Sequence, residues 1–405
     1  FKLKRRFEGL QVDAQYGLSE AGDNRTVNVG ALLGSNLADG RGNVVFALDY
    51  ADRGEVRNTD RSFYRAAFLT GLTPASSAFL GTGYYKGNDG NPPSQEALDA
   101  YFAQFGAAPG SVLRTTNLGF NPDAATLFNL IGPDIYNYSG PLYPDYVFDT
   151  TTTPGRAQFK QNHSANGLIS LPMTRYSLFG RAEYDVAENV TFFVQGMSTH
   201  YSSMTEGGSP TADNYWQFSI PRDAEHPVPA PLAALLDSRA DPNANWLLGK
   251  TLTFLGRGQV DHDNDVWQVV AGFEGRLPFR DWTWEAYGSH GEMRLIDTYR
   301  SGFAEFARVQ ELLSAPFYGM NYTSPSGGTC TSGLLPFGDL NGPNVTLNPG
   351  AGGFATGIIG PNGQEIVIPQ TVSQDCIDFI SPVAKSATEQ SQDVVEAFVQ
   401  GGLFE

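Results

Sequence analysis

The stretch Leu10-Gln-Val-Asp-Ala-Gln-Tyr-Gly-Leu18 decides the fold, because apolar and polar residues alternate along it without a break. A period of two places the two sets on opposite faces of an extended strand. The same pattern returns in residues 27–33, where the apolar residues at odd positions are set against Asn28 and Gly30, and in residues 44–50, where those at even positions have Asp49 on the other face. The sequence therefore predicts three strands before Asp52.

Alternating segments also occur much farther along the chain. They cover residues 176–186, 190–201, 267–277, 282–296 and 393–403. In the second of these, the adjacent Phe192 and Phe193 leave open which face is apolar. Together with the first three, these segments predict about eight strands.

The connections between the predicted strands alternate in length. Tight links at 36–41, 187–189 and 278–281 alternate with long ones at about 53–173, 202–260 and 297–390. Because successive antiparallel strands reverse direction, the tight links share one end and the long ones share the other. Short periplasmic turns and long extracellular loops are typical of outer-membrane barrels. We therefore predict an all-β protein with an antiparallel transmembrane β-barrel, and short helices within its loops near 93–106, 229–239 and 303–314.

Composition excludes some classes of protein. The 405 residues carry a formal net charge of −17, so a nucleic-acid partner is not expected. No run of about 18 apolar residues forms a candidate transmembrane helix. A barrel strand needs only every second residue to be apolar, so this does not count against a barrel. Two alternatives stay open, a passive porin and a secreted β-rich adhesin or lectin whose apolar strand faces form a soluble core.

Aromatic residues recur near the ends of the predicted strands. Their rings suit the headgroup level of a membrane, although soluble β-sandwiches also use aromatic strand residues. These residues are Tyr16, Tyr50, Tyr176, Tyr184, Tyr201, Trp267, Trp282 and Trp284.

The first long loop is rich in tyrosine. Flat rings of this kind can stack on sugars or aromatic ligands, and packing within the loop would explain them equally well. The candidate ligand-binding residues are Tyr84, Tyr85, Tyr136, Tyr138, Tyr143 and Tyr146.

Neither a catalytic motif nor a metal site is evident. No nucleophile elbow, phosphate-binding loop or zinc motif is present, so we expect no enzyme and no cofactor. Residues 261–265 (Asp-His-Asp-Asn-Asp) resemble a calcium loop but lack its glycine and terminal glutamate, and a solvated strand end explains them better. Cys330 and Cys376 have no neighbouring ligands at zinc spacing. A disulfide in an oxidising compartment is favoured, with two free thiols as the alternative.

Several stretches resemble the TonB-dependent receptors of Gram-negative outer membranes. Residues 1–17 (Phe-Lys-Leu-Lys-Arg-Arg-Phe-Glu-Gly-Leu-Gln-Val-Asp-Ala-Gln-Tyr-Gly) are similar to the passage from the plug domain into the first barrel strand. Residues 33–44, 175–186 and 267–275 resemble successive hairpins of these barrels. So do Pro229–Pro242 and the arrangement of Cys330, Pro336-Phe337-Gly338 and Cys376.

The resemblance implies a 22-stranded barrel closed by an N-terminal plug. It implies uptake of a large scarce nutrient, such as an iron chelate, cobalamin or an oligosaccharide, energised through TonB. On this view residues 1–8 end the plug, and residues 9–405 form about eight of the strands. The rest of the plug and the TonB box would be missing, so the chain would be an internal fragment. The implied partners are outer-membrane lipid, TonB and the nutrient, and the long loops, including the one carrying both cysteines, would be extracellular.

Overall fold

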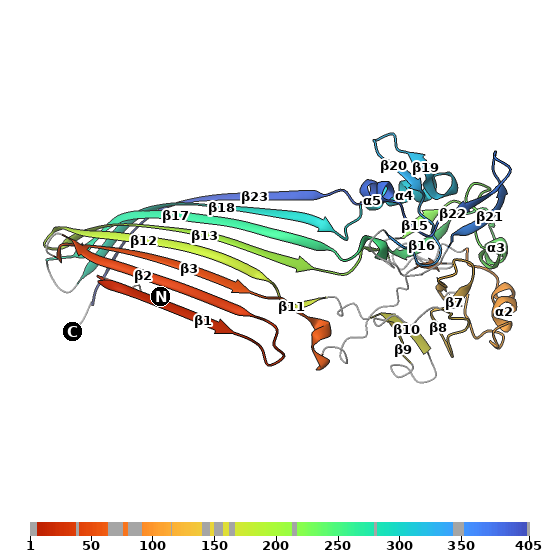
Figure 1. Cartoon of the computed structure of the whole chain (residues 1–405), viewed down its shortest axis with the longest axis horizontal. Coiled ribbons are helices and arrows are strands. Elements are labelled where there is room, and N and C mark those ends of the chain that lie inside the picture. Colours follow the sequence, from red (N-terminus) through yellow and green to blue (C-terminus); the bar gives the residue numbers. More distant parts are fainter. Residues whose placement is uncertain are drawn as a thin grey trace.

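One large antiparallel sheet forms most of the length of the molecule (Figure 1). The computed structural model describes residues 6–37, 40–63, 76–79, 91–114, 116–139, 146–149, 157–161, 167–212, 217–278, 282–342 and 352–402. The sheet has eight strands, each paired with the neighbour that precedes or follows it in the sheet. In order across the sheet, these are β1 (Gly9–Gly17), β2 (Thr26–Leu37), β3 (Gly42–Arg53), β12 (Met173–Ala187), β13 (Val190–Glu206), β17 (Gln259–Arg276), β18 (Thr283–Ser301) and β23 (Ala384–Gln400).

The eight strands lie where the alternating segments predicted them, but most are longer. β17 begins at Gln259, eight residues before the predicted start at Trp267, and thus contains the whole 261–265 run. Alternation continues through that run, with aspartate in place of apolar residues on one face. The sheet is open, with β1 and β23 as its edges in the described part of the chain.

Connection length separates the two ends of the sheet. Short turns join β2 to β3, β12 to β13 and β17 to β18 at what we call the tight-turn end. The long-loop end holds the connections 54–172, 207–258 and 302–383, and also the short β1–β2 turn. In Figure 1 the three long loops gather into a separate mass at this end, which we call the loop body.

The loop body contains short strands and helices. Its strands, including those at its junction with the sheet, are β4 (Val56–Arg57), β5 (Ser76–Phe79), β6 (Leu118–Phe120), β7 (Leu127–Asn129), β8 (Ile131–Gly132), β9 (Tyr146–Asp149), β10 (Ala157–Gln161), β11 (Leu168–Ser170), β14 (Thr211–Ala212), β15 (Phe218–Ile220), β16 (Trp246–Thr251), β19 (Met320–Thr323), β20 (Thr329–Ser332), β21 (Phe354–Ile359) and β22 (Glu365–Ile368). Its helices are α2 (Gln95–Ala103), α3 (Ala230–Asp237), α4 (Phe306–Ser314) and α5 (Gln374–Ile380), with 3₁₀ turns η2 (Asn58–Asp60), η3 (Thr253–Leu255) and η4 (Pro316–Gly319).

Three of these helices lie at the predicted positions. α2 begins after Ser94, whose hydroxyl accepts a hydrogen bond from the Ala97 amide at 3.1 Å, and it buries Leu98 and Phe102. α3 and α4 likewise bury leucines on one side. α5 was not predicted, because seven residues give too few turns for a helical period to be visible.

A single hydrophobic core joins the three long loops. β5 of the first loop pairs with β16 of the second, which carries the buried Trp246. The Trp246 indole stacks on Phe337 of the third loop, with ring centroids 6.2 Å apart. The loop body is therefore one packed unit, contributed by segments far apart in the sequence. None of the helices in the described residues is long and apolar enough to cross a membrane.

Candidate membrane-contact surface

The cross-strand register collects the apolar strand residues on one face of the large sheet, which we call the apolar face. Leu10, Leu33 and Phe46 are direct neighbours on β1, β2 and β3. Val12, Ala31, Leu48 and Leu178 form the next row. The side chains of Phe46 and Leu48 are 53% and 59% exposed. A broad apolar surface on this scale marks a contact with another protein or with a membrane.

The opposite face, which we call the polar face, is more crowded. Val269 and Val270 are neighbours in β17 and point to opposite faces, yet Val269 is 45% exposed and Val270 only 8%. The middle of β17 packs chiefly against its neighbouring strands β13 and β18. At this point of the sheet the side chains of the polar face are therefore packed more closely than those of the apolar face.

The register also resolves the ambiguity at Phe192 and Phe193. Phe192 lies on the apolar face, where its ring is 5.3 Å from that of Phe273. Phe193 lies on the polar face, buried beneath the guanidinium of Arg181 at 4.6 Å.

Two rows of aromatic rings border the apolar face. Towards the long-loop end, Tyr50 and Tyr176 lie with ring centroids 5.2 Å apart. Towards the tight-turn end, Tyr184 is a direct neighbour of Phe192. Of the aromatic residues singled out in the sequence, Tyr201 departs from this pattern, because it pairs with Arg175 and points to the polar face.

The border between apolar and charged side chains runs obliquely across the strands. One row of directly opposed residues crosses the whole sheet. It contains the apolar Leu10 and Phe46 towards the β1 edge and the polar His290 and Asp393 towards the β23 edge. Towards the long-loop end, the apolar series on β1 continues six residues beyond this row, to Tyr16. On β23 it ends two residues before the row, at Val395. Over the seven steps from β1 to β23 the border thus shifts by eight residues, about one per strand. A flat plane cutting a sheet of tilted, staggered strands gives such a shift.

Beyond this border the apolar face carries charged pairs. Asp52 pairs with Arg25, and the carboxylate of Asp265 is 2.8 Å from His200 Nδ1. Arg294 and Glu389 pair at 3.3 Å. These pairs lie on the long-loop side of the border, where water can solvate them. In the described residues, no cluster of three or more potential ligands could hold a metal ion, and residues 261–265 are part of a strand.

The candidate tyrosines of the first loop do not form a common cluster in the described structure. Tyr136 packs against the main core, and its amide donates to Asn129 Oδ1 at 2.6 Å. Tyr138 packs edge-on against Phe128 at 4.9 Å, and burial, with a further effect of Asp339, raises the pKa of its hydroxyl to about 12. Tyr84, Tyr85 and Tyr143 lie outside the described residues, as does the side chain of Tyr146, whose backbone is in β9. A ligand-binding role for the set stays a prediction.

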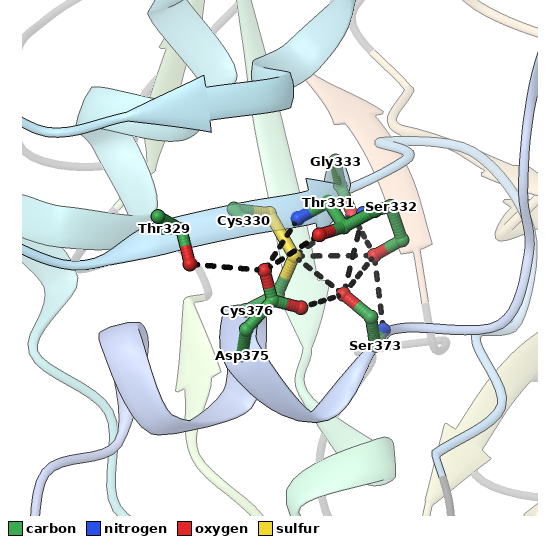
Figure 2. Close-up of a disulfide and its surroundings, with 8 residues drawn as sticks. All are labelled: Thr329, Cys330, Thr331, Ser332, Gly333, Ser373, Asp375 and Cys376. Atoms are coloured by element: carbon green, nitrogen blue, oxygen red, sulfur yellow. Dashed lines mark hydrogen bonds between the residues drawn. A yellow bond between two sulfur atoms is a disulfide. The ribbon is translucent and has the colours of Figure 1, made fainter.

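Cys330 and Cys376 form a disulfide, in line with the pairing favoured from the sequence. Figure 2 shows it linking β20 to α5 inside a polar shell. Asp375 accepts hydrogen bonds from the amide and the hydroxyl of Thr331, each at 2.8 Å, and from the Ser373 hydroxyl. Both cysteines are fully buried.

Several buried charged residues escaped the sequence analysis, among them Glu206 and Lys250. Glu206, at the end of β13, accepts hydrogen bonds from Arg57, from Arg257 at 2.9 Å and from Gln259 at 2.8 Å, where the sheet meets the loop body. Lys250 is fully enclosed in the loop body and donates to the carbonyls of Pro336 and Gly338 at 3.1 and 3.2 Å. Nothing in their neighbouring sequence distinguishes them from surface charges, because their partners come from distant segments.

No family model, curated protein or solved structure matches this chain.

Proposed function

We propose that this chain forms part of the wall of a TonB-dependent receptor in a Gram-negative outer membrane. Its apolar face would contact lipid, its polar face would form the concave lining of the lumen, and its loop body would face the outside. The parent protein would import a large scarce nutrient. The observation that carries the membrane assignment is the exposed apolar face with its oblique border.

The width of the apolar face supports this proposal. On β12 it extends from Tyr184 to Tyr176, which is eight residue steps. At roughly 3.3 Å per step and a tilt of about 40°, this spans roughly 20 Å, close to the roughly 25 Å apolar band of outer-membrane barrels. A soluble adhesin or lectin would instead need a second layer packed on this face.

The active-transport part of the proposal is supported by the family resemblance of the hairpin sequences and of the start of the chain. A loop body with its own core and disulfide also suits a receptor that captures a ligand. A passive porin needs an unobstructed mouth. A TonB-dependent receptor requires energy for transport and a passive porin does not, so this requirement distinguishes the two candidate functions.

Depth measurements on the full-length parent protein test the membrane assignment. Single cysteines would replace Ala271 on the apolar face, Asp263 beyond its border and Gln268 on the polar face. A fluorophore on each would be exposed to brominated lipids, while the native cysteines stay in their buried disulfide. We expect strong quenching at position 271 alone. An unquenched fluorophore there, or a parent protein that is soluble without detergent, would refute the assignment.

A further inference from the structure

The polar face has an uncharged zone over four neighbouring strands. Its four central rows run from β13 to β23, and none of their sixteen residues is charged. The rows are Gln195–Val270–Ser289–Val394, Met197–Gln268–Gly291–Gln392, Thr199–Val266–Met293–Gln390 and Tyr201–Asn264–Leu295–Thr388. Charged residues resume on both sides, with Glu274, Glu285 and Glu396 towards the tight-turn end and Asp297 towards the long-loop end.

A hollow of about 260 Å³ lies within this zone. Gly291 forms the floor of the hollow because it has no side chain, whereas its two cross-strand neighbours, Gln268 and Gln392, have long ones. A Cβ atom at Gly291 would lie 3.0 Å from the Trp267 carbonyl oxygen and 3.3 Å from Gln268 Cγ. Besides Gly291, the polar-face residues around the hollow are Met197, Val266, Gln268, Met293, Gln390 and Gln392. Its lining also includes Trp267, Glu292 and Ser391, which by register belong to the opposite face.

Three amide groups surround the hollow without a protein partner. In the described part of the chain, the side chains of Gln268, Gln390 and Gln392 make no hydrogen bond to another residue. Each offers two N–H donors and one carbonyl acceptor. Gln195, in contrast, accepts a hydrogen bond from Arg181 at 3.0 Å. The three amides around the hollow are therefore available to a ligand.

We propose that this hollow is a subsite for a neutral, hydroxyl-rich ligand such as an oligosaccharide. Hydroxyl groups both donate and accept hydrogen bonds, which matches the amides. The methionines offer soft apolar contacts for the carbon-bound hydrogens of a sugar ring. An anionic iron chelate would lose water here without meeting an opposite charge. The inference rests on the proposed function, which makes this face the lining of the lumen, and it narrows the substrate class.

Binding measurements on the full-length parent protein test the subsite. The probes are a panel of neutral oligosaccharides (linear glucans, xylans and N-acetylhexosamine oligomers) and two anionic complexes, ferric citrate and a ferric catecholate. We expect at least one oligosaccharide to bind and neither iron complex to do so. The double variant Gln268→Ala/Gln392→Ala should bind that oligosaccharide at least about tenfold more weakly, because two amide hydrogen bonds are lost. Gln15→Ala, on the same face of β1, is the matched control and should bind normally.

The outcomes that would overturn the subsite differ from the outcome that would overturn the proposed function. Binding of the iron complexes alone, binding of no probe, or equal affinity of the double variant and Gln15→Ala would each overturn the subsite. So would a cross-link showing that another segment of the parent protein fills the hollow. All four results are compatible with brominated-lipid quenching at position 271. Loss of that quenching would instead overturn the proposed function itself.

Discussion

Single residues hold the loop body together through contacts that only the folded chain creates. Lys250 is the clearest case, since its ammonium group is enclosed with two backbone carbonyls as partners. Burial lowers the pKa of this lysine to about 7, and the nearby Asp339 only partly offsets the effect. The pKa of Asp375 is also lowered, for a different reason: burial alone would raise it, but hydrogen bonds from Ser373, Thr331 and Thr329 favour the charged carboxylate and outweigh burial.

Lys250 predicts a pH dependence of stability. Its folded pKa lies below the usual 10.5, so between pH 7 and 10.5 the unfolded chain binds a proton that the folded chain does not. The free energy of unfolding of the loop body should therefore rise with pH across this window. Thermal unfolding of the parent protein at several pH values measures the slope, and Lys250→Met should flatten it. An equally steep slope in this variant would show that other groups cause it.

The disulfide predicts a local loss of stability. Replacing Cys330 and Cys376 by alanine frees a loop that spans 46 residues. The free energy of unfolding of the loop body should fall by about 2–5 kcal/mol. Limited proteolysis would detect this as faster cleavage in residues 302–383, while the strands of the large sheet stay protected. Labelling of both thiols in the unmodified native protein would contradict the pairing.

At the scale of elements, the alternation of apolar and polar residues predicted the strands, and the cross-strand register determined which of their residues share a face. The long-loop ends of the strands were missed because charged residues replace apolar ones there, as in residues 261–265 of β17. The face of β13 could not be read from its own sequence, since Phe192 and Phe193 are equally apolar. Pairing with Tyr184 and Phe273 resolves it.

The two faces of β17 predict opposite responses to a new charge. Ala271→Arg places a guanidinium in the middle of the apolar face, which should cost roughly 2–4 kcal/mol if that face meets lipid. Gln268→Arg adds the same group three residues away on the polar face and should have little effect. The measurement is the yield of folded, heat-modifiable parent protein in the membrane fraction. Equal yields of the two variants would contradict a lipid contact at Ala271.

At the scale of the whole molecule, the asymmetry of the connections separates the large sheet from the loop body. The sheet bears the exposed apolar face, and the loop body at one end has a core of its own. The glutamate Glu206 and the arginines Arg57 and Arg257 tie the two together.

The proposed function predicts that the parent protein as a whole transports its nutrient at the expense of energy. Uptake of its nutrient should stop when the inner-membrane proton gradient is collapsed with a protonophore, because TonB would no longer transmit energy. Binding of the nutrient to the cell surface should persist. Uptake that continues at the same rate after the gradient is collapsed would favour a passive porin.

The sequence by itself determined the strands, the two ends of the sheet and three of the loop helices, because alternation, turns and helix caps are local. The tertiary structure alone decided the shared core of the three loops, the burial of Lys250 and Glu206, and the hollow around Gly291. The candidate tyrosines illustrate this limit, since Tyr136 and Tyr138 pack against residues that their local sequence does not reveal. Each of these features joins residues that are distant in the chain, and a local pattern cannot specify which distant segments will meet.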